Sequence, residues 1–145
     1  MKTYQPKAKE ITRNWHLVDA EGQILGRIAS QIVKFLMGKQ KTSYAPHMDM
    51  GDWVVVVNAL EVKLTGRKRK QKLYRSHSGY PGGYKEVKFE KMISEQPEKV
   101  IRHAVSGMLP GNRLKKKRLA RLRIFSGSEH DYKDKFSKKS RRAGE

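Results

Sequence analysis

The run Trp-Val-Val-Val-Val-Asn, residues 53–58, decides the fold class of this 145-residue chain. Four consecutive valines leave no alternation between a buried and an exposed face, and their β-branched side chains favour extended backbone. A continuous apolar run of this kind is typical of a strand that is covered on both faces, as in a parallel sheet between helices. We therefore predict an α/β protein with a strand of a parallel sheet at residues 53–57.

The segments on either side of this strand complete the pattern. Residues 15–19 (WHLVD) and 121–125 (RLRIF) predict two further strands. Apolar residues at helical spacing predict a helix over residues 25–36 that ends at Gly38, where a helix C-cap belongs. A second helix is expected from Pro97, since proline suits the first helical position.

Weaker patterns lie between these elements: residues 61–64 and 73–74 are strand candidates, and residues 89–93 suggest a short helix. The length suits one compact domain, placed at residues 15–127. A basic arm, residues 1–14, precedes it. Residues 128–145 are polar and basic, and we expect this tail to order only on a partner.

Charge is the dominant feature of the composition. Thirty-three Lys and Arg against 14 Asp and Glu give a net charge of +19, and self-repulsion on this scale favours a polyanionic partner. The longest apolar run is far shorter than a membrane span, and no long helix pairs a basic face with an aromatic one. Composition therefore predicts nucleic acid as the partner, and no membrane.

The cations gather in three runs, and the first two contain no acid. A merely solvated surface usually mixes both signs, whereas cations without countercharge suit a phosphate backbone. The first two runs are therefore the main candidate RNA contacts, with Lys39 and Lys41 as a weaker region. The runs comprise Arg67, Lys68, Arg69, Lys70, Lys72 and Arg75; Arg113, Lys115, Lys116, Lys117, Arg118, Arg121 and Arg123; and Lys133, Lys135, Lys138, Lys139, Arg141 and Arg142.

A glycine-rich loop, SHSGYPGGYK at residues 76–85, follows the first run. It lacks the lysine-serine/threonine pair and the helix start of a nucleotide-binding loop. His77, Tyr80 and Lys85 instead favour contact with structured RNA, in which rings stack on unpaired bases. The alternative is a purely structural turn between a strand and a helix. Tyr74 fits either stacking or core packing.

Enzyme chemistry has one candidate, the stretch HMDMGD with His47, Asp49 and Asp52. These three could hold a metal in an RNA-processing enzyme, but such a stretch is more often a turn whose carboxylates cap backbone amides. The serines beside His77 lack an orienting group for nucleophilic catalysis. The absence of cysteine excludes disulfides and thiolate metal sites. We predict no catalytic residues, no metal and no cofactor, with His16 and His103 structural.

Four stretches together identify a family by their order and spacing: VDAEGQILGRIAS (18–30), GDWVVVVNA (51–59), LTGRK with KLYRSHSGYPGGYK (64–85) and PEKVIRHAVSGMLP (97–110). Over about residues 1–127 the sequence resembles the universal large-subunit ribosomal protein number thirteen family, in its bacterial-type form. The resemblance implies a three-layer α/β/α domain around a small parallel sheet.

The resemblance also implies a non-catalytic protein of the cytoplasmic ribosome. Its partners would be large-subunit ribosomal RNA and neighbouring large-subunit proteins, with an early role in subunit assembly. Some members also bind messenger RNA. The family's usual His-Pro-His after the last strand is replaced here by His130-Asp131-Tyr132, so RNA contacts of the tail rest on charge alone. A free regulatory RNA-binding module is the remaining alternative.

Overall fold

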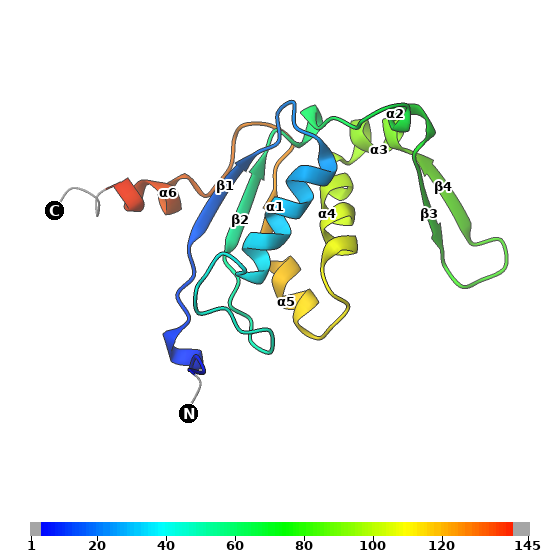
Figure 1. The fold of residues 1–145 in the computed structure, drawn as a ribbon. Coiled ribbons are helices and arrows are strands. Elements are labelled where there is room, and N and C mark those ends of the chain that lie inside the picture. Colours follow the sequence, from blue (N-terminus) through cyan, green and yellow to red (C-terminus); the bar gives the residue numbers. More distant parts are fainter. Residues whose placement is uncertain (1–3, 141–145) are drawn as a thin grey trace.

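The computed structural model describes residues 4–140 as a mixed α/β domain with a small, mostly parallel sheet. Three parallel strands lie in the order β1 (Trp15–Asp19), β2 (Trp53–Val57) and β5 (Leu122–Ile124) (Figure 1). Val54, Val55 and Val56 in the central strand are each 0% exposed. The valine run thus forms the two-sided, buried strand that the sequence predicts. Arg141 and Arg142 of the third basic run lie outside the described residues.

Three helices cover one face of this sheet: α1 (Leu25–Met37), α4 (Pro97–Met108) and α5 (Leu114–Ala120) (Figure 1). Val54 and Val56 point into the core that these helices share, together with Ile28 of α1 and Ile101 of α4. Both long helices follow the predicted bounds closely because their apolar stripes are strictly periodic. α5 was not predicted, since its sequence, LKKKRLA, resembles a solvated basic run.

The C-terminal segment packs against the start of β1 on the opposite face of the sheet. Trp15 and Trp53 stack with their ring centroids 4.9 Å apart, and Tyr132 stacks on Trp15 at 5.2 Å. Helix α6 (Lys133–Ser140) follows Tyr132 and lies beside β1 (Figure 1). The structure differs here from the expectation of a tail that orders only on a partner. Tyr132 and Phe136 are isolated aromatic residues in a polar stretch, and both rings pack against Trp15 of the sheet.

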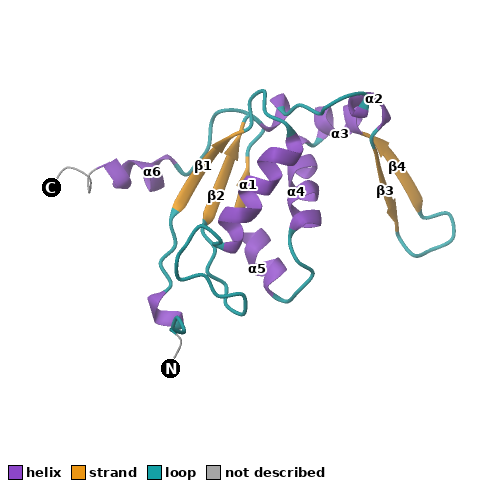
Figure 2. Cartoon of the chain, in the orientation of Figure 1, coloured by secondary structure: helices purple, strands orange, loops and turns teal. Residues whose placement is uncertain are grey.

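A β-hairpin projects from the helical layer and is separate from the central sheet (Figures 1 and 2). It consists of β3 (Leu73–His77) and β4 (Tyr84–Lys88), paired antiparallel. The short helices α2 (Lys68–Gln71) and α3 (Phe89–Glu95) join it to the domain. Two 3₁₀ turns, Ala8–Glu10 and Ala59–Glu61, complete the described elements. Residues 61–64 contribute only one isolated bridge, between Ile24 and Lys63.

Two glycines let the HMDMGD loop lie directly against the end of α1. Gly38 caps the helix with φ 78°, the left-handed region that glycine adopts without strain. A Cβ on Gly51 would stand 1.7 Å from the carbonyl oxygen of Leu36. Only backbone without side chains can approach this closely, so the loop is held in one position beside the helix.

We expect Gly51→Ala to lower the free energy of unfolding by about 3 kcal/mol, because the backbone must move to admit the methyl group. Gly26→Ala is the matched control, since a Cβ there meets nothing within 4 Å. Within a helix it should stabilise the protein by up to about 1 kcal/mol. Urea denaturation of both variants checks the pair. A Gly51→Ala protein as stable as the parent would contradict this account of the close approach.

Candidate nucleic-acid interface

Asp52, at the end of the HMDMGD loop, is a buried anion with a full set of partners. Its carboxylate is 0% exposed. It accepts hydrogen bonds from the Asn14 backbone amide at 3.1 Å, His16 Nε2 at 2.8 Å and Gln40 Nε2 at 2.8 Å. Lys41 pairs with its Oδ1 atom. Asp52 thus caps a backbone amide, but it is that of Asn14, 38 residues away, and not one within the turn. Three side chains from outside the loop add to it.

Asp49 binds three arginines in the same loop region. Arg121 forks onto both of its carboxylate oxygens. Arg118 Nε lies 3.9 Å and Arg13 Nη2 3.7 Å from the carboxylate. Arg118 and Arg121 come from the end of α5 and the start of β5, whereas Arg13 belongs to the N-terminal arm. One carboxylate thus joins segments far apart in the chain.

These partners determine the charge state of both carboxylates. Burial raises the pKa of Asp49, but the hydrogen bond and positive charge of Arg121, with Arg13 and Arg118, outweigh it and lower the pKa overall. Burial likewise raises the pKa of Asp52, and bonds from His16, Lys41 and the Asn14 amide more than offset it. Among residues 4–140 no group of three metal-ligating side chains converges. Both acids are occupied by cations, which is a structural role.

Two residues of the predicted RNA-contact set belong to this network. The Arg118 side chain is only 1% exposed. Lys41 Nζ donates to the carbonyls of Thr12 and Met50 as well as pairing with Asp52. Arg118 and Lys41 therefore have acidic partners within the protein, and RNA contact by these two residues stays a prediction. Lys39, two residues before Lys41, remains exposed.

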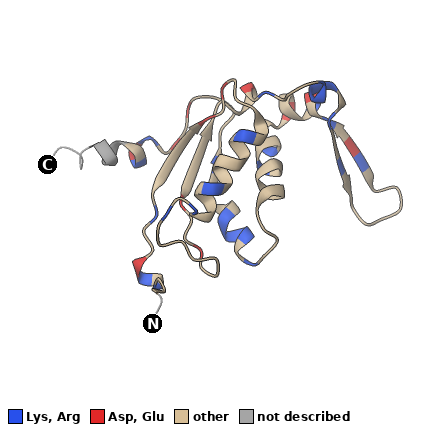
Figure 3. Ribbon diagram, viewed as in Figure 1, with Lys and Arg blue, Asp and Glu red and all other residues tan. Residues whose placement is uncertain are grey.

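The first basic run forms an exposed surface over α2 and the base of the hairpin, visible as blue segments in Figure 3. Arg67 to Lys70 are all exposed. Arg69 and Arg75 have acidic neighbours at 4.0 and 3.6 Å, but exposed pairs of this kind contribute little. Lys72 lies over the Tyr74 ring, 5.4 Å from its centroid. Tyr74 itself is 8% exposed, which settles the alternatives for it in favour of core packing.

The glycine-rich loop is the connection between the two hairpin strands. Backbone hydrogen bonds from Ser78 to Gly83 and from Gly83 to Tyr80 close it tightly. Tyr80 stands out at its tip with 75% exposure, and His77 and Lys85 are exposed beside it. The loop joins antiparallel strands and does not open a helix, so it lacks the geometry of a nucleotide-binding loop.

Helix α5 carries the second basic run and divides it by orientation. Lys116 and Lys117 are exposed, Lys115 is half-buried, and Arg113 is exposed just before the helix. Arg118 and Leu119 turn inward to the core. The exposed cations of α5 and those of α2 and the hairpin therefore form two separate surfaces.

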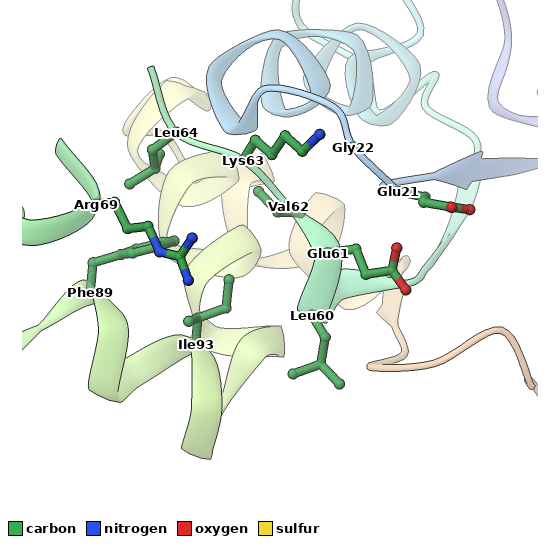
Figure 4. A pocket seen from close by; sticks show the side chains of 10 residues that line it. All are labelled: Glu21, Gly22, Leu60, Glu61, Val62, Lys63, Leu64, Arg69, Phe89 and Ile93. Atoms are coloured by element: carbon green, nitrogen blue, oxygen red, sulfur yellow. The ribbon is translucent and has the colours of Figure 1, made fainter. Parts of the chain in front are cut away.

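A cavity of about 560 Å³ beside the end of β1 does not suit an anion. Its lining mixes Arg69 and Lys63 with the carboxylates of Glu21 and Glu61 (Figure 4). The Arg69 guanidinium lies near the apolar side chains on the opposite wall. Because the two carboxylates repel phosphate, this cavity is an unfavourable part of the surface for RNA.

Comparison with known proteins identifies the family to which this chain belongs. The family model for ribosomal protein L13 matches residues 13–131, which is most of the chain. The chain belongs to the ribosomal protein L13 family. The match covers the sheet, the hairpin and both basic surfaces, so the resemblance noted from four short motifs extends through nearly all of the described domain.

Relatives in this family are similar over nearly their full length. The large ribosomal subunit protein uL13 of Thermoanaerobacter sp. (strain X514) is 52% identical over 91% of this chain and 92% of its own. That of Clostridioides difficile (strain 630) is also 52% identical over the same shares. That of Roseiflexus castenholzii is 51% identical over 91% of this chain and 90% of its own.

The lowered pKa values of Asp49 and Asp52 predict a specific acid sensitivity of the fold. A carboxyl whose pKa is depressed in the folded state stabilises it above the unfolded value, about 3.9, and this stabilisation is lost as pH falls through the folded value. We expect the free energy of unfolding to fall steeply below about pH 4.

Replacing Asp49 separates its contribution to the acid dependence of stability from that of the other carboxyl groups. Asp49→Asn should cost about 3–5 kcal/mol at pH 7, because it leaves buried arginines uncompensated, and should flatten the acid dependence. Asp131→Asn, at an exposed position, should change stability by no more than about 0.5 kcal/mol. Urea titrations at pH 7 and pH 3 measure both. An unchanged acid dependence in Asp49→Asn would contradict the role of this network.

Proposed function

We propose that this chain is a structural constituent of the large ribosomal subunit and binds large-subunit ribosomal RNA. Membership of a ribosomal protein family supports the assignment, as do relatives whose names place them in the large subunit. The observation that carries RNA binding is the exposed run at residues 67–70, four consecutive cations with no acid between them. The chain is not an enzyme in this proposal, since the carboxylates of its one candidate site are bound to Arg and Lys.

The RNA-contact set that we propose combines both basic surfaces with the hairpin loop. Its members share exposure or partial exposure and freedom from the buried ion-pair network. They are Lys39, Arg67, Lys68, Arg69, Lys70, Lys72, Arg75, His77, Tyr80, Lys85, Arg113, Lys115, Lys116 and Lys117.

The mechanism is electrostatic and geometric. Each cation that neutralises a phosphate releases condensed counterions, which gives binding its free energy and its salt dependence. The rigid α/β core holds two such surfaces in a fixed relation, so RNA segments that contact both are held in a fixed relation as well. Tyr80, at the hairpin tip, can add stacking on an unpaired base. Neutralising neighbouring RNA segments in this way favours the compact RNA fold and thereby subunit assembly.

Neighbouring subunit proteins are the remaining partners in this proposal. No helix in the described part of the chain is long and apolar enough to cross a membrane. The same cations would also admit messenger RNA, because phosphate contacts carry no sequence information.

Neutralising the α2 run tests the phosphate contacts. We expect a variant with Arg67, Lys68, Arg69 and Lys70 all replaced by Ala to flatten the plot of log affinity against log salt. The slope should change by about 0.7–0.9 for each phosphate that the variant no longer neutralises. A charge-preserving variant, with Arg and Lys exchanged at the same four positions, should retain the slope. Filter binding to a large-subunit RNA transcript provides the measurement, and equal slopes for all three proteins would show that this run is only solvated.

Association with the particle tests the proposal as a whole. We expect the tagged protein to sediment with large ribosomal subunits and to remain bound after a high-salt wash, since its contacts are distributed over two surfaces. A protein that sediments only in the free fraction would favour the regulatory RNA-binding module. Metal-dependent RNA cleavage that Asp49→Ala or Asp52→Ala abolishes would favour an enzyme.

A further inference from the structure

A groove of about 400 Å³ lies between the hairpin and the helical layer. Its floor is apolar: Tyr74 and Val87 come from the hairpin, Met92 from α3 and Leu119 from α5. Its polar residues are Arg75, Ser76, Lys99, Arg102, His103 and Ser106, and no acid lines it. The combination of an apolar floor with three cations distinguishes it from the mixed-charge cavity beside β1.

The position of the groove links the two proposed RNA surfaces. Arg75 belongs to the hairpin, which continues from the cations of α2, whereas Leu119 belongs to α5 and its lysines. An RNA segment that contacts both surfaces by the shortest route therefore passes over this groove. The contribution of α4 is its polar face, with Lys99 and Arg102 exposed one turn apart.

Phosphate contacts alone do not use an apolar floor, but a nucleotide uses both features of the groove. A base extruded from a helix is flat, aromatic and apolar on its faces, while its flanking phosphates are anionic. Tyr74 and His103 make an edge-to-face contact, with centroids 5.3 Å apart; Tyr74 is buried, and the exposed His103 ring offers the surface for a further ring. We propose that this groove receives one unpaired nucleotide of the ribosomal RNA.

In the bound arrangement the base lies on the floor, and Arg75, Lys99 and Arg102 neutralise the phosphates on either side. The side-chain hydroxyls of Ser76 and Ser106 supply hydrogen bonds to polar edges of the base. An apolar segment of another protein would fill the floor but leave Lys99 and Arg102 without countercharge, so RNA is the better complement. This inference rests on the proposed function and names a site within it.

Filling the groove tests the proposal. Ser106→Trp places a large side chain among the lining residues, and we expect roughly a 10-fold loss of affinity for a large-subunit RNA transcript, the cost of losing one stacked base. The salt slope should fall by at most about 0.7–0.9 for each flanking phosphate that leaves Arg75, Lys99 or Arg102 when the base is excluded. Ser94→Trp, on the exposed side of α3 beside Glu95, is the matched control and should bind like the parent.

The outcomes separate the groove from the broader function. If the parent shows salt-dependent binding and Ser106→Trp binds equally well, the groove proposal is overturned and the proposed function stands. If the parent shows no salt-dependent binding, the proposed function fails with it. If Ser106→Trp keeps its RNA affinity but loses a neighbouring protein in reconstituted subunits, the groove is a protein site and the proposal is wrong.

A second variant guards against misfolding. His103 is exposed, so His103→Ala removes a ring from the groove wall without opening the core. It should weaken RNA binding several-fold with an unchanged salt slope, because the groove stays open and its cations remain, while thermal unfolding stays at the parental temperature. Photocrosslinking of a 4-thiouridine-substituted transcript should join the RNA to groove residues. A folded His103→Ala protein with parental affinity and no crosslink to the groove would refute the site.

Discussion

A buried and a half-buried carboxylate, Asp52 and Asp49, hold this strongly basic chain together. Asp49 and Asp52 stand three residues apart in one loop, yet their partners come from the arm, from β1, from the loop after α1 and from the junction of α5 with β5. In a protein of net charge +19 these cations would otherwise repel one another. Placing an acid at the centre of each group turns that repulsion into attraction between distant segments. The glycine between them, Gly51, sets the distance by allowing the loop to touch α1.

The same network decides which cations of the second basic run stay at the surface, where we propose that they contact RNA. Within the run RLKKKRLAR the residues are chemically alike, but helical periodicity separates them. Arg118 and Arg121 are three positions apart and turn toward Asp49, whereas Lys116 and Lys117 turn outward. The inward arginines fix the orientation of α5, and that orientation presents the outward lysines. The position of the outward lysines, which we propose bind RNA, therefore depends on the inward arginines, although the lysines do not contact Asp49.

The sequence predicts the helices and strands whose formation depends on residues close together in the chain. The valine run, the apolar stripe of α1 and the proline that begins α4 each carry their signal within a few residues, and the structure places all three as predicted. The ion pairs carry no such signal, because Asp49 and Arg121 are 72 residues apart. Strand β4 was missed for a related reason: YKEVK lacks an apolar face and is a strand only by pairing with β3. Tyr132 likewise shows its role only when Trp15 is beside it.

The hairpin packs against the rest of the domain only at its base. An isolated two-stranded hairpin is marginally stable in water. Here Tyr74 is buried at its base, but residues from Arg75 to the Tyr80 tip are exposed. The outer half is therefore held by its own ladder, by the tight loop and by the ion pair between Arg75 and Glu86 across the strands. In the RNA binding that we propose, phosphates at the exposed cations of the hairpin would steady the wall of the groove that faces α4. Binding at the hairpin and binding in the groove should then reinforce one another, because each orders backbone that the other uses.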